Sequence, residues 1–225
     1  MAPPPHVTGA PPPPGTVPGV AAFDFDGTLV PGDSLRPYLM AVRGRIAMAI
    51  ALARSASPML RGYATDGRDG AKAALLVRAM AGVPVIHALD VGVRFGAALV
   101  TRIRPDMAAR VRWHRQQGHR LIVVSASLDL YLDEFGRRAG FDQVIATKLA
   151  VSGNGPGAVL TGAIDGANVR AQEKEQRLRA AIGPAPPELW AYGNSSGDHE
   201  MLAMADHAYW VDGTRLTLST PPVER

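Results

Sequence analysis

The chain has 225 residues, 47% of them apolar, which suits one α/β domain with an insertion better than two large independent cores. Cysteine is absent, so a disulfide framework, a thiolate metal site and a cysteine nucleophile are excluded. The net charge of +4 is uneven, because positions 33–104 hold eleven basic and four acidic residues and the rest of the chain is acidic on balance.

The chain begins with the proline-rich stretch MAPPPHVTGAPPPPGTVP, residues 1–18. It lacks the basic and apolar regions of a secretory signal, and its prolines prevent helix formation, so we expect a disordered or polyproline tail. No apolar run approaches the roughly 20 residues of a membrane span. A cytoplasmic protein is the expectation that follows.

The first predicted strand is the apolar run at 20–25, which Gly27 ends. Residues 34–104 have a helical pattern throughout, with breaks near Ser57-Pro58, Gly67 and Gly82. Three helices are predicted there, at 34–56, 68–81 and 84–103. A further helix at 105–118 follows.

Strands and helices alternate over the rest of the chain. The predicted strands lie at 120–127, 143–147, 188–192 and 207–211. The predicted helices lie at 128–139, 168–182 and 198–205. Residues 148–164 are expected to form a hairpin flap, and the tail from Gly213 to be loosely held. This alternation predicts an α/β fold with a doubly wound parallel sheet, whose ligands bind at the carboxyl ends of the strands.

Two carboxylates, Asp24 and Asp26, follow the first strand in the stretch FDFDGTLV. At i and i+2 of an extended chain they point the same way, and they would repel unless a cation or a shared proton lay between them. Mg²⁺ relieves such repulsion, since it binds carboxylates, phosphate and water. The same composition is also common in turns, so the pair could instead simply end a strand.

Two further stretches could bind an anion. Ser125 and the neighbouring N–H groups end a strand that enters a helix, which forms a phosphate site. A helix cap, a role that Ser127 could equally fill, is the alternative. Lys174 offers a positive charge that can neutralise phosphate, although it could also be one more solvated lysine beside two glutamates.

Four stretches together resemble the motifs of the haloacid dehalogenase superfamily. They are FDFDGTLV, then VVSAS at 123–127, then Lys174 in GANVRAQEKEQRL, and AYGNSSGDHEML at 191–202. The helical insertion between the first two motifs is similar to that of subclass IB, which contains the phosphoserine phosphatases. The resemblance covers about residues 20–211. It implies a Rossmann-like core with an inserted α-helical cap.

The resemblance also implies a reaction and a set of roles. Asp24 would attack phosphorus to form an aspartyl-phosphate, and Asp26 would protonate the leaving oxygen and then activate water. The phosphate-binding residues would be Ser125, Ala126 and Lys174. The cofactor would be Mg²⁺, held by Asp24, Asp26 (through its backbone carbonyl), Asn194 and Asp198.

Two positions qualify the resemblance. Asn194 stands where the fourth motif often has an acidic residue; it can still offer one oxygen to Mg²⁺ but lacks the charge. Asp33 lies where phosphoserine phosphatases hold the substrate ammonium, but the arginine that those enzymes use for the substrate carboxylate has no clear counterpart. Asp33 could instead mark, with Ser34, the start of the first inserted helix.

The sequence thus predicts a tail at 1–18, a catalytic core at 19–33 and 105–213, a helical cap at 34–104 and a C-terminal tail at 214–225. The predicted function is a Mg²⁺-dependent phosphatase acting on a small or lipid-linked anionic phosphomonoester, either phosphoserine-like or phosphatidylglycerophosphate-like. A catalytically weak phospholigand-binding protein and a phosphotransferase to an acceptor other than water are the alternatives.

Partners are less defined by the sequence. The basic segment has few aromatic residues and no nucleic-acid motif, which argues against DNA or RNA binding. An apolar, basic stripe near 43–54 could rest on an anionic membrane surface, but the pattern favours burial in the core of the cap. The oligomeric state is left open.

Overall fold

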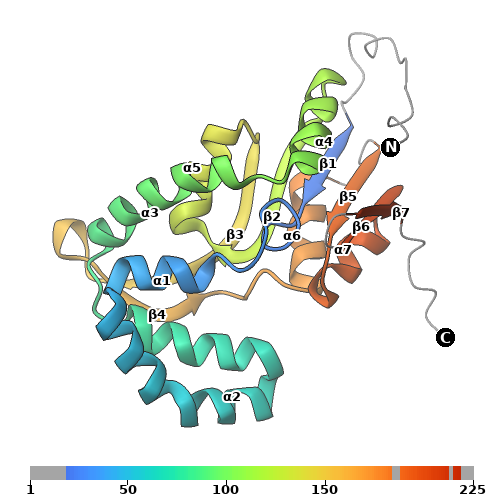
Figure 1. Cartoon of the computed structure of the whole chain (residues 1–225). Coiled ribbons are helices and arrows are strands. Elements are labelled where there is room, and N and C mark those ends of the chain that lie inside the picture. Colours follow the sequence, from blue (N-terminus) through green and yellow to red (C-terminus); the bar gives the residue numbers. More distant parts are fainter. Residues whose placement is uncertain (1–18, 184–187, 213–214, 219–225) are drawn as a thin grey trace.

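The computed structural model describes residues 19–183, 188–212 and 215–218 (Figure 1). Within these residues seven strands form one sheet in the order β4-β3-β2-β1-β5-β6-β7. The strands are β1 (Val20–Phe23), β2 (Arg120–Leu128), β3 (Gln143–Ser152), β4 (Val159–Asp165), β5 (Leu189–Gly193), β6 (His207–Asp212) and β7 (Arg215–Leu218). The five central strands are parallel, and β4 and β7 pair antiparallel at the two edges. The predicted α/β class with a mainly parallel sheet is confirmed.

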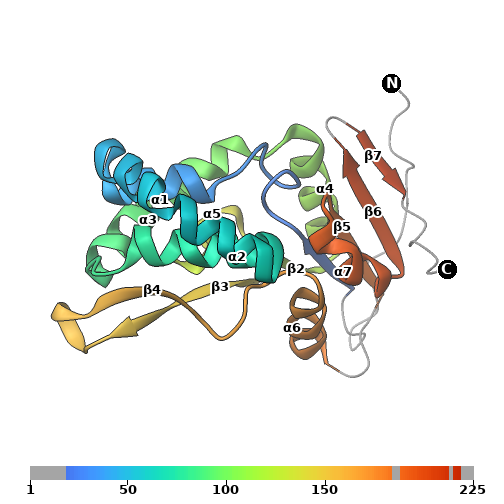
Figure 2. The same cartoon turned by 90° about the horizontal axis from the view of Figure 1, so that it is seen from below.

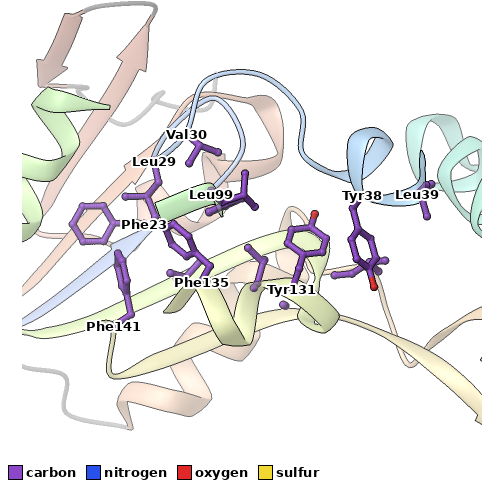
Figure 3. Packing of buried hydrophobic residues seen from close by; sticks show 14 of the residues in the cluster. Phe23, Leu29, Val30, Tyr38, Leu39, Leu99, Tyr131, Phe135 and Phe141 are labelled. Carbon is purple, nitrogen blue, oxygen red and sulfur yellow. The ribbon is translucent and has the colours of Figure 1, made fainter. Parts of the chain in front are cut away.

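The side chains of β1 alternate between the two faces of the sheet. Ala21 and Phe23 join one buried apolar cluster, and Val20 and Ala22 join the other. Helices α4 (Pro105–Gln116) and α5 (Asp129–Ala139) contribute to the first cluster, while α6 (Gln172–Ile182) and α7 (His199–Ala203) contribute to the second. Figure 3 shows Phe23, Phe135 and Phe141 packed together in the first cluster.

Helices fill the segment between β1 and α4: α1 (Leu35–Arg43), α2 (Arg45–Met80) and α3 (Val85–Leu99), followed by one 3-10 turn, Val100–Arg102. The predicted first helix is divided at Gly44, whose φ of 78° is left-handed. The predicted break at Ser57-Pro58 is wrong, because α2 continues through Pro58. Proline removes one backbone N–H, and the carbonyl of Arg54 that it would have bonded lies in an exposed turn, where water can hydrate it.

The break near Gly67 is confirmed, since Asp66 and Gly67 leave helical geometry and α2 folds back there into two arms (Figure 1). The arms approach most closely at two glycines: a Cβ on Gly62 would lie 2.5 Å from the backbone oxygen of Gly70. The next helix, α3, packs on α5 in the same way, because a Cβ on Gly92 would lie 1.9 Å from the oxygen of Leu130. The division into core and cap at the predicted boundaries stays a prediction.

The first arm of α2, residues 45–65, has an inner and an outer face. Met48 is buried in the first apolar cluster and Leu52 packs against it. Ile46 and Ile50, in contrast, are 81% and 48% exposed. The interpretation of the apolar stripe as cap core therefore holds for the inner face and is wrong for the outer one.

At one edge of the sheet the strands are those predicted, and at the other edge an additional strand is present. The hairpin is confirmed as β3 and β4, which lie side by side in Figure 2. The expectation of a loosely held tail is wrong for β7, which pairs with β6 through Tyr209↔Leu218 and three further positions. The predicted N-terminal tail, and the C-terminal tail apart from β7, lie outside the described residues. Of the helices in the described part of the chain, none combines the length and apolar character needed to cross a membrane.

A buried histidine under β5 makes the stability of the protein depend on pH. The Nε2 atom of His114 lies 2.8 Å from the Tyr192 hydroxyl, and its Nδ1 atom lies 2.8 Å from Nδ1 of His119. Burial, reinforced by His119 and Arg110, lowers the pKa of His114 to about 3. The unfolded chain, with an ordinary histidine pKa of about 6.5, therefore binds a proton that the folded chain rejects between those two values.

We expect His114→Gln to flatten the fall in stability below pH 6.5. Wild-type stability from this residue is fully present above pH 6.5 and is lost toward pH 3, at up to about 1.4 kcal/mol per pH unit. Urea unfolding at pH 7 and pH 5 measures the difference. The carboxylates contribute equally in both proteins, so parallel pH profiles would contradict the prediction.

Candidate active site

The predicted site residues meet at the carboxyl ends of the parallel strands. Asp24 directly follows β1, Ser125 lies near the end of β2, and Asn194 directly follows β5. These strands are neighbours in the sheet, so their ends share one edge. A cleft of about 720 Å³ opens there. The predicted residues that line it are Asp24, Asp26, Asp33, Ser125, Ala126, Lys174, Asn194 and Asp198.

Lys174 lies between two carboxylates at the floor of the cleft. Its Nζ atom is 2.5 Å from Oδ1 of Asp24 and 2.5 Å from Oδ1 of Asp198, and all three side chains are buried. Burial disfavours the ammonium, but the two carboxylates outweigh it and raise the pKa of Lys174 on balance. The alternative of a solvated lysine is therefore wrong.

Asp24 is buried beside that ammonium. Burial raises its pKa to about 7, against the opposing attraction of Lys174, and the charges of Asp198 and Asp26 push the same way as burial. The pKa shift of Asp24 is upward even though Asp24 has an ion-pair partner, because burial outweighs the attraction of Lys174. A cation bound beside Asp24 would favour its ionised, nucleophilic form.

The Asp26 side chain is fixed by two serines. Its Oδ1 atom accepts a hydrogen bond from the Ser34 backbone N–H at 2.8 Å, and its Oδ2 atom accepts one from the Ser127 hydroxyl at 2.5 Å. Burial raises the pKa of Asp26 despite these bonds. A carboxyl tuned upward is suited to giving and taking a proton. Ser127 is thus a partner of Asp26, while Leu128 occupies the cap position of α5, so the capping alternative for Ser127 is wrong.

One buried oxygen points to a cation. The Oδ1 atom of Asn194 is buried and has no hydrogen-bond partner in the described residues. Such an atom is costly unless something else binds it. Gly27 makes the room for this side chain, since its φ is 81° and a Cβ there would lie 2.0 Å from Nδ2 of Asn194. The residues at the cleft therefore fit a hard divalent ion.

The donor set for such an ion is mixed. The described residues contain no group of three or more histidine or acidic side chains arranged to hold a metal. Asp24, Asp26 and Asn194 all line the cleft and carry carboxylate or amide oxygens, the ligand type that Mg²⁺ prefers. Asp198 is engaged elsewhere, because its Oδ2 atom accepts bonds from the Asn194 and Ser195 N–H groups and from the Ser195 hydroxyl. These contacts assign Asp198 to positioning the loop and Lys174, and its predicted role as a metal ligand remains a prediction.

Asp33 lies at the rim of the cleft and holds the start of α1. Its two carboxylate oxygens each accept a backbone hydrogen bond, from Leu35 and Arg36, both at 3.2 Å. These contacts are those of the helix-start alternative. A contact between Asp33 and substrate remains a prediction.

A second lysine, Lys72, lines the cleft, although no sequence motif predicted it. From α2, the Lys72 Nζ atom reaches across to the Ala126 carbonyl and to Oδ1 of Asn168, both at 2.5 Å. The Asn168 amide in turn donates to Asp69 at 2.9 Å. Burial lowers the pKa of Lys72 to about 8. No motif marks Lys72, and only the fold-back of α2 brings it to the cleft.

Ala171, at the start of α6, is the one non-glycine residue in the described part of the chain with a positive φ. Its φ is 53° and its ψ is −127°. Its N–H bonds to the Gly197 oxygen at 2.9 Å, which joins the loops of the third and fourth motifs. A side chain in this region costs about 1–3 kcal/mol. The strained residue, Ala171, therefore lies three positions before Lys174 in the chain.

We expect Ala171→Gly to raise the free energy of unfolding by about 1 kcal/mol, because relief of strain exceeds the entropy that glycine adds to the unfolded chain. Ala203→Gly, at an exposed position in α7, should instead lower it by about 1 kcal/mol. Urea unfolding of both variants is the measurement. Equal destabilisation by the two changes would show that Ala171 is unstrained.

The chain is similar to known proteins in both sequence and fold. A model of haloacid dehalogenase-like hydrolases matches residues 21–203. Protein CicA of Caulobacter vibrioides (strain NA1000 / CB15N) is 38% identical over 194 residues, which are 85% of each chain. A protein of unknown function from Bordetella pertussis Tohama I has a TM-score of 0.69 at 22% identity, covering 86% of this chain and 89% of that one.

A phospho-aspartyl intermediate analogue of phosphoserine phosphatase has a TM-score of 0.57 at 17% identity and covers 86% of both chains. At such identities the structural likeness shows the fold alone. The family model, in contrast, spans most of the chain, and the CicA identity of 38% extends over 85% of it. The chain therefore belongs to the haloacid dehalogenase-like hydrolase family.

Proposed function

We propose that this hydrolase is a Mg²⁺-dependent phosphomonoesterase that works through an aspartyl-phosphate. The observation that carries the proposal is the buried contact of Lys174 with Asp24 beside a second carboxyl, Asp26, that is held in place by two serines. A nucleophile, a cation to neutralise the incoming phosphate and a proton donor thus share one cleft.

The steps follow from the residues. A carboxylate oxygen of Asp24 attacks phosphorus, and the bond from phosphorus to the leaving oxygen breaks as Asp26 gives that oxygen its proton. Asp26 then takes a proton from water, whose oxygen attacks the same phosphorus and releases inorganic phosphate and the Asp24 carboxylate. The Ser125 hydroxyl and the Ala126 N–H would hold the phosphate oxygens, and Lys174 would offset their charge.

Mg²⁺, when bound by Asp24, the Asp26 carbonyl and Asn194, would neutralise charge on the transferring phosphoryl group. Asp198 would keep Lys174 and the Asn194 loop in place through the hydrogen bonds described above. The protein residues alone therefore account for nucleophile, proton transfer and orientation.

Beside its five aspartates, the cleft has basic side chains that can bind negative charge beyond the phosphate. Arg68, Lys72 and Arg170 line it in addition to Lys174. Structurally similar proteins include phosphoserine phosphatases, which supports a small phosphoester. The proposed substrate class is an anionic phosphomonoester, phosphoserine-like or carrying a phosphatidylglycerophosphate-like head group.

A screen of phosphate release tests the proposal. The purified chain with Mg²⁺ is offered phosphoserine, sugar phosphates, histidinol phosphate, nucleotides and phosphatidylglycerophosphate. Turnover of at least one, abolished by a chelator and restored by Mg²⁺, is the expected result. Binding of phosphate analogues without turnover would favour the phospholigand-binding alternative, for which Asn194 in place of an acidic residue is the motivation. Consumption of the substrate with transfer of its phosphoryl group to an added alcohol, in place of release as inorganic phosphate, would favour a phosphotransferase.

We expect Asn194→Asp to lower the Mg²⁺ concentration needed for half-maximal activity by about tenfold, because a carboxylate adds a charge at a ligand position. The Mg²⁺-free variant should also be less stable than wild type, since one more buried carboxylate then faces Asp24 and Asp198. Asn154→Asp, on the exposed β3–β4 loop, is the matched control. An unchanged Mg²⁺ requirement would remove Asn194 from the ligand set.

A further inference from the structure

The outer face of the first arm of α2 carries an apolar stripe that only Ser57 interrupts. Its members recur at helical spacing, so they share one face. They are Ile46, Ile50, Ala53, Leu60 and Ala64, all exposed. Ile46 and Leu60 are 81% and 72% exposed. Figure 1 shows this arm at the outer edge of the molecule: it begins beside α1, and its later part runs along the second arm of α2.

Such a stripe is unusual on a protein surface. Single exposed apolar side chains are normal, but contiguous ones mark contact surfaces. Here apolar side chains lie on both sides of Ser57 on one face of a single helix, over about five turns. The same arm buries Met48 and Leu52 on its other face, so its fold does not depend on covering the stripe.

The charge along the stripe is mainly positive, and the exposed Asp66 lies just beyond its end. Arg45, Arg54 and Arg61 are exposed on this arm, and no acidic residue occurs between positions 34 and 65. A shallow cavity of about 260 Å³ between the two arms adds Arg78 next to Arg54 and Ile50. The exposed apolar residues of α3 differ, because there Asp90 pairs with Arg94 at 2.7 Å.

We propose that the outer face of the first arm of α2 is a membrane-contacting surface that lies in the plane of an anionic bilayer. Helices that bind in this way combine an apolar face with flanking arginine or lysine residues. The apolar side chains would enter the acyl boundary while the arginines meet lipid phosphates.

Charge complementarity selects this occupant over a second copy of the chain. Two such stripes facing each other would bring arginines from both copies together with no carboxylate between positions 34 and 65 to pair them. A soluble anion would satisfy the arginines but would leave Ile46, Ile50 and Leu60 in water. An anionic lipid surface would pair the arginines with phosphate groups and would also remove the apolar side chains from water.

Co-sedimentation of the full chain with vesicles tests the proposal. Binding is expected to vesicles of phosphatidylcholine mixed with phosphatidylglycerol, to weaken as salt is added, and to be absent with phosphatidylcholine alone. Arg54→Gln/Arg61→Gln should weaken binding about 30-fold, since each arginine near the surface contributes about fivefold. Ile46→Ser/Ile50→Ser should weaken it about tenfold or more.

Matched changes elsewhere serve as controls. Arg112→Gln on α4 and Val151→Ser on β3 alter exposed residues of the same kind away from this arm and should leave binding unchanged. Circular dichroism and hydrolysis of a soluble phosphoester report the fold and the cleft separately, so failure of the phosphatase proposal would not imitate failure of this one.

Three outcomes would overturn the proposal: no binding to the mixed vesicles, equal binding to both vesicle types, or wild-type binding by the stripe variants. Sedimentation velocity adds a fourth. A wild-type dimer that Ile46→Ser/Ile50→Ser converts to monomer would assign the stripe to a second copy of the chain.

Discussion

Asp24→Asn is expected to lower the rate of phosphate release by about 1000-fold or more, because an amide oxygen is a poor nucleophile toward phosphorus. The fold should persist. Lys174 keeps its contact with Asp198, and the buried cluster loses one of its two carboxylates next to the ammonium. Phosphate release gives the rate, and mass spectrometry of acid-quenched protein detects a phosphoryl group on wild type but none on the variant.

Two further variants make the result specific. Asp90→Asn changes an exposed carboxylate on α3 and should retain full activity. Asp24→Glu keeps the charge but displaces the oxygens by one methylene within a buried cluster, so its rate should also fall by about 100-fold or more. Turnover by Asp24→Asn at the wild-type rate would rule Asp24 out as the nucleophile.

The sequence could predict that the site residues lie together at one edge of the sheet, because it indicated the order of the strands along the chain and their direction. The runs at 20–25 and 120–127 are apolar enough to be strands buried on both faces, and the alternation with helices makes them parallel. Parallel neighbours end at one edge, so Asp24, Ser125 and Asn194 had to converge once those strands were adjacent. Lys174 needed the motif order as well, because its local sequence is that of a solvated helix.

What could not be predicted depends on contacts between distant segments. Lys72 and Asn168 are 96 positions apart and meet only because α2 folds back at Asp66 and Gly67. Periodicity near 43–54 showed that an apolar face exists, but not whether another element covers it. The structure divides that face, with Met48 buried and Ile46 exposed. Pro58 does not end the helix as its residue type predicted, because an exposed turn tolerates the loss of one backbone hydrogen bond.

Lys174→Met should lower the free energy of unfolding of the Mg²⁺-free protein by about 3–5 kcal/mol at pH 8, because it leaves two buried carboxylates without their shared cation. The loss should grow with pH. The unfolded Asp24 carboxyl titrates near 4, whereas the folded one has a pKa already raised to about 7 by burial and higher still without Lys174. Below pH 4 the carboxyl is protonated in both states and imposes little penalty. Between pH 4 and the raised folded pKa, the unfolded chain has released the proton that the folded chain keeps, so stability falls as pH rises through that window and levels off above it.

The double variant Asp24→Asn/Lys174→Met separates charge from packing. If repulsion between Asp24 and Asp198 causes the instability, removing the Asp24 charge should restore about 1–3 kcal/mol of it, and most of the pH dependence should disappear. If the lost packing of the lysine stem were the cause, the double variant would be no more stable than Lys174→Met. Lys148→Met, at an exposed position of β3, controls for the loss of a lysine. Urea unfolding in the presence of a chelator at pH 5 and pH 8 decides between the two, since only repulsion changes with pH.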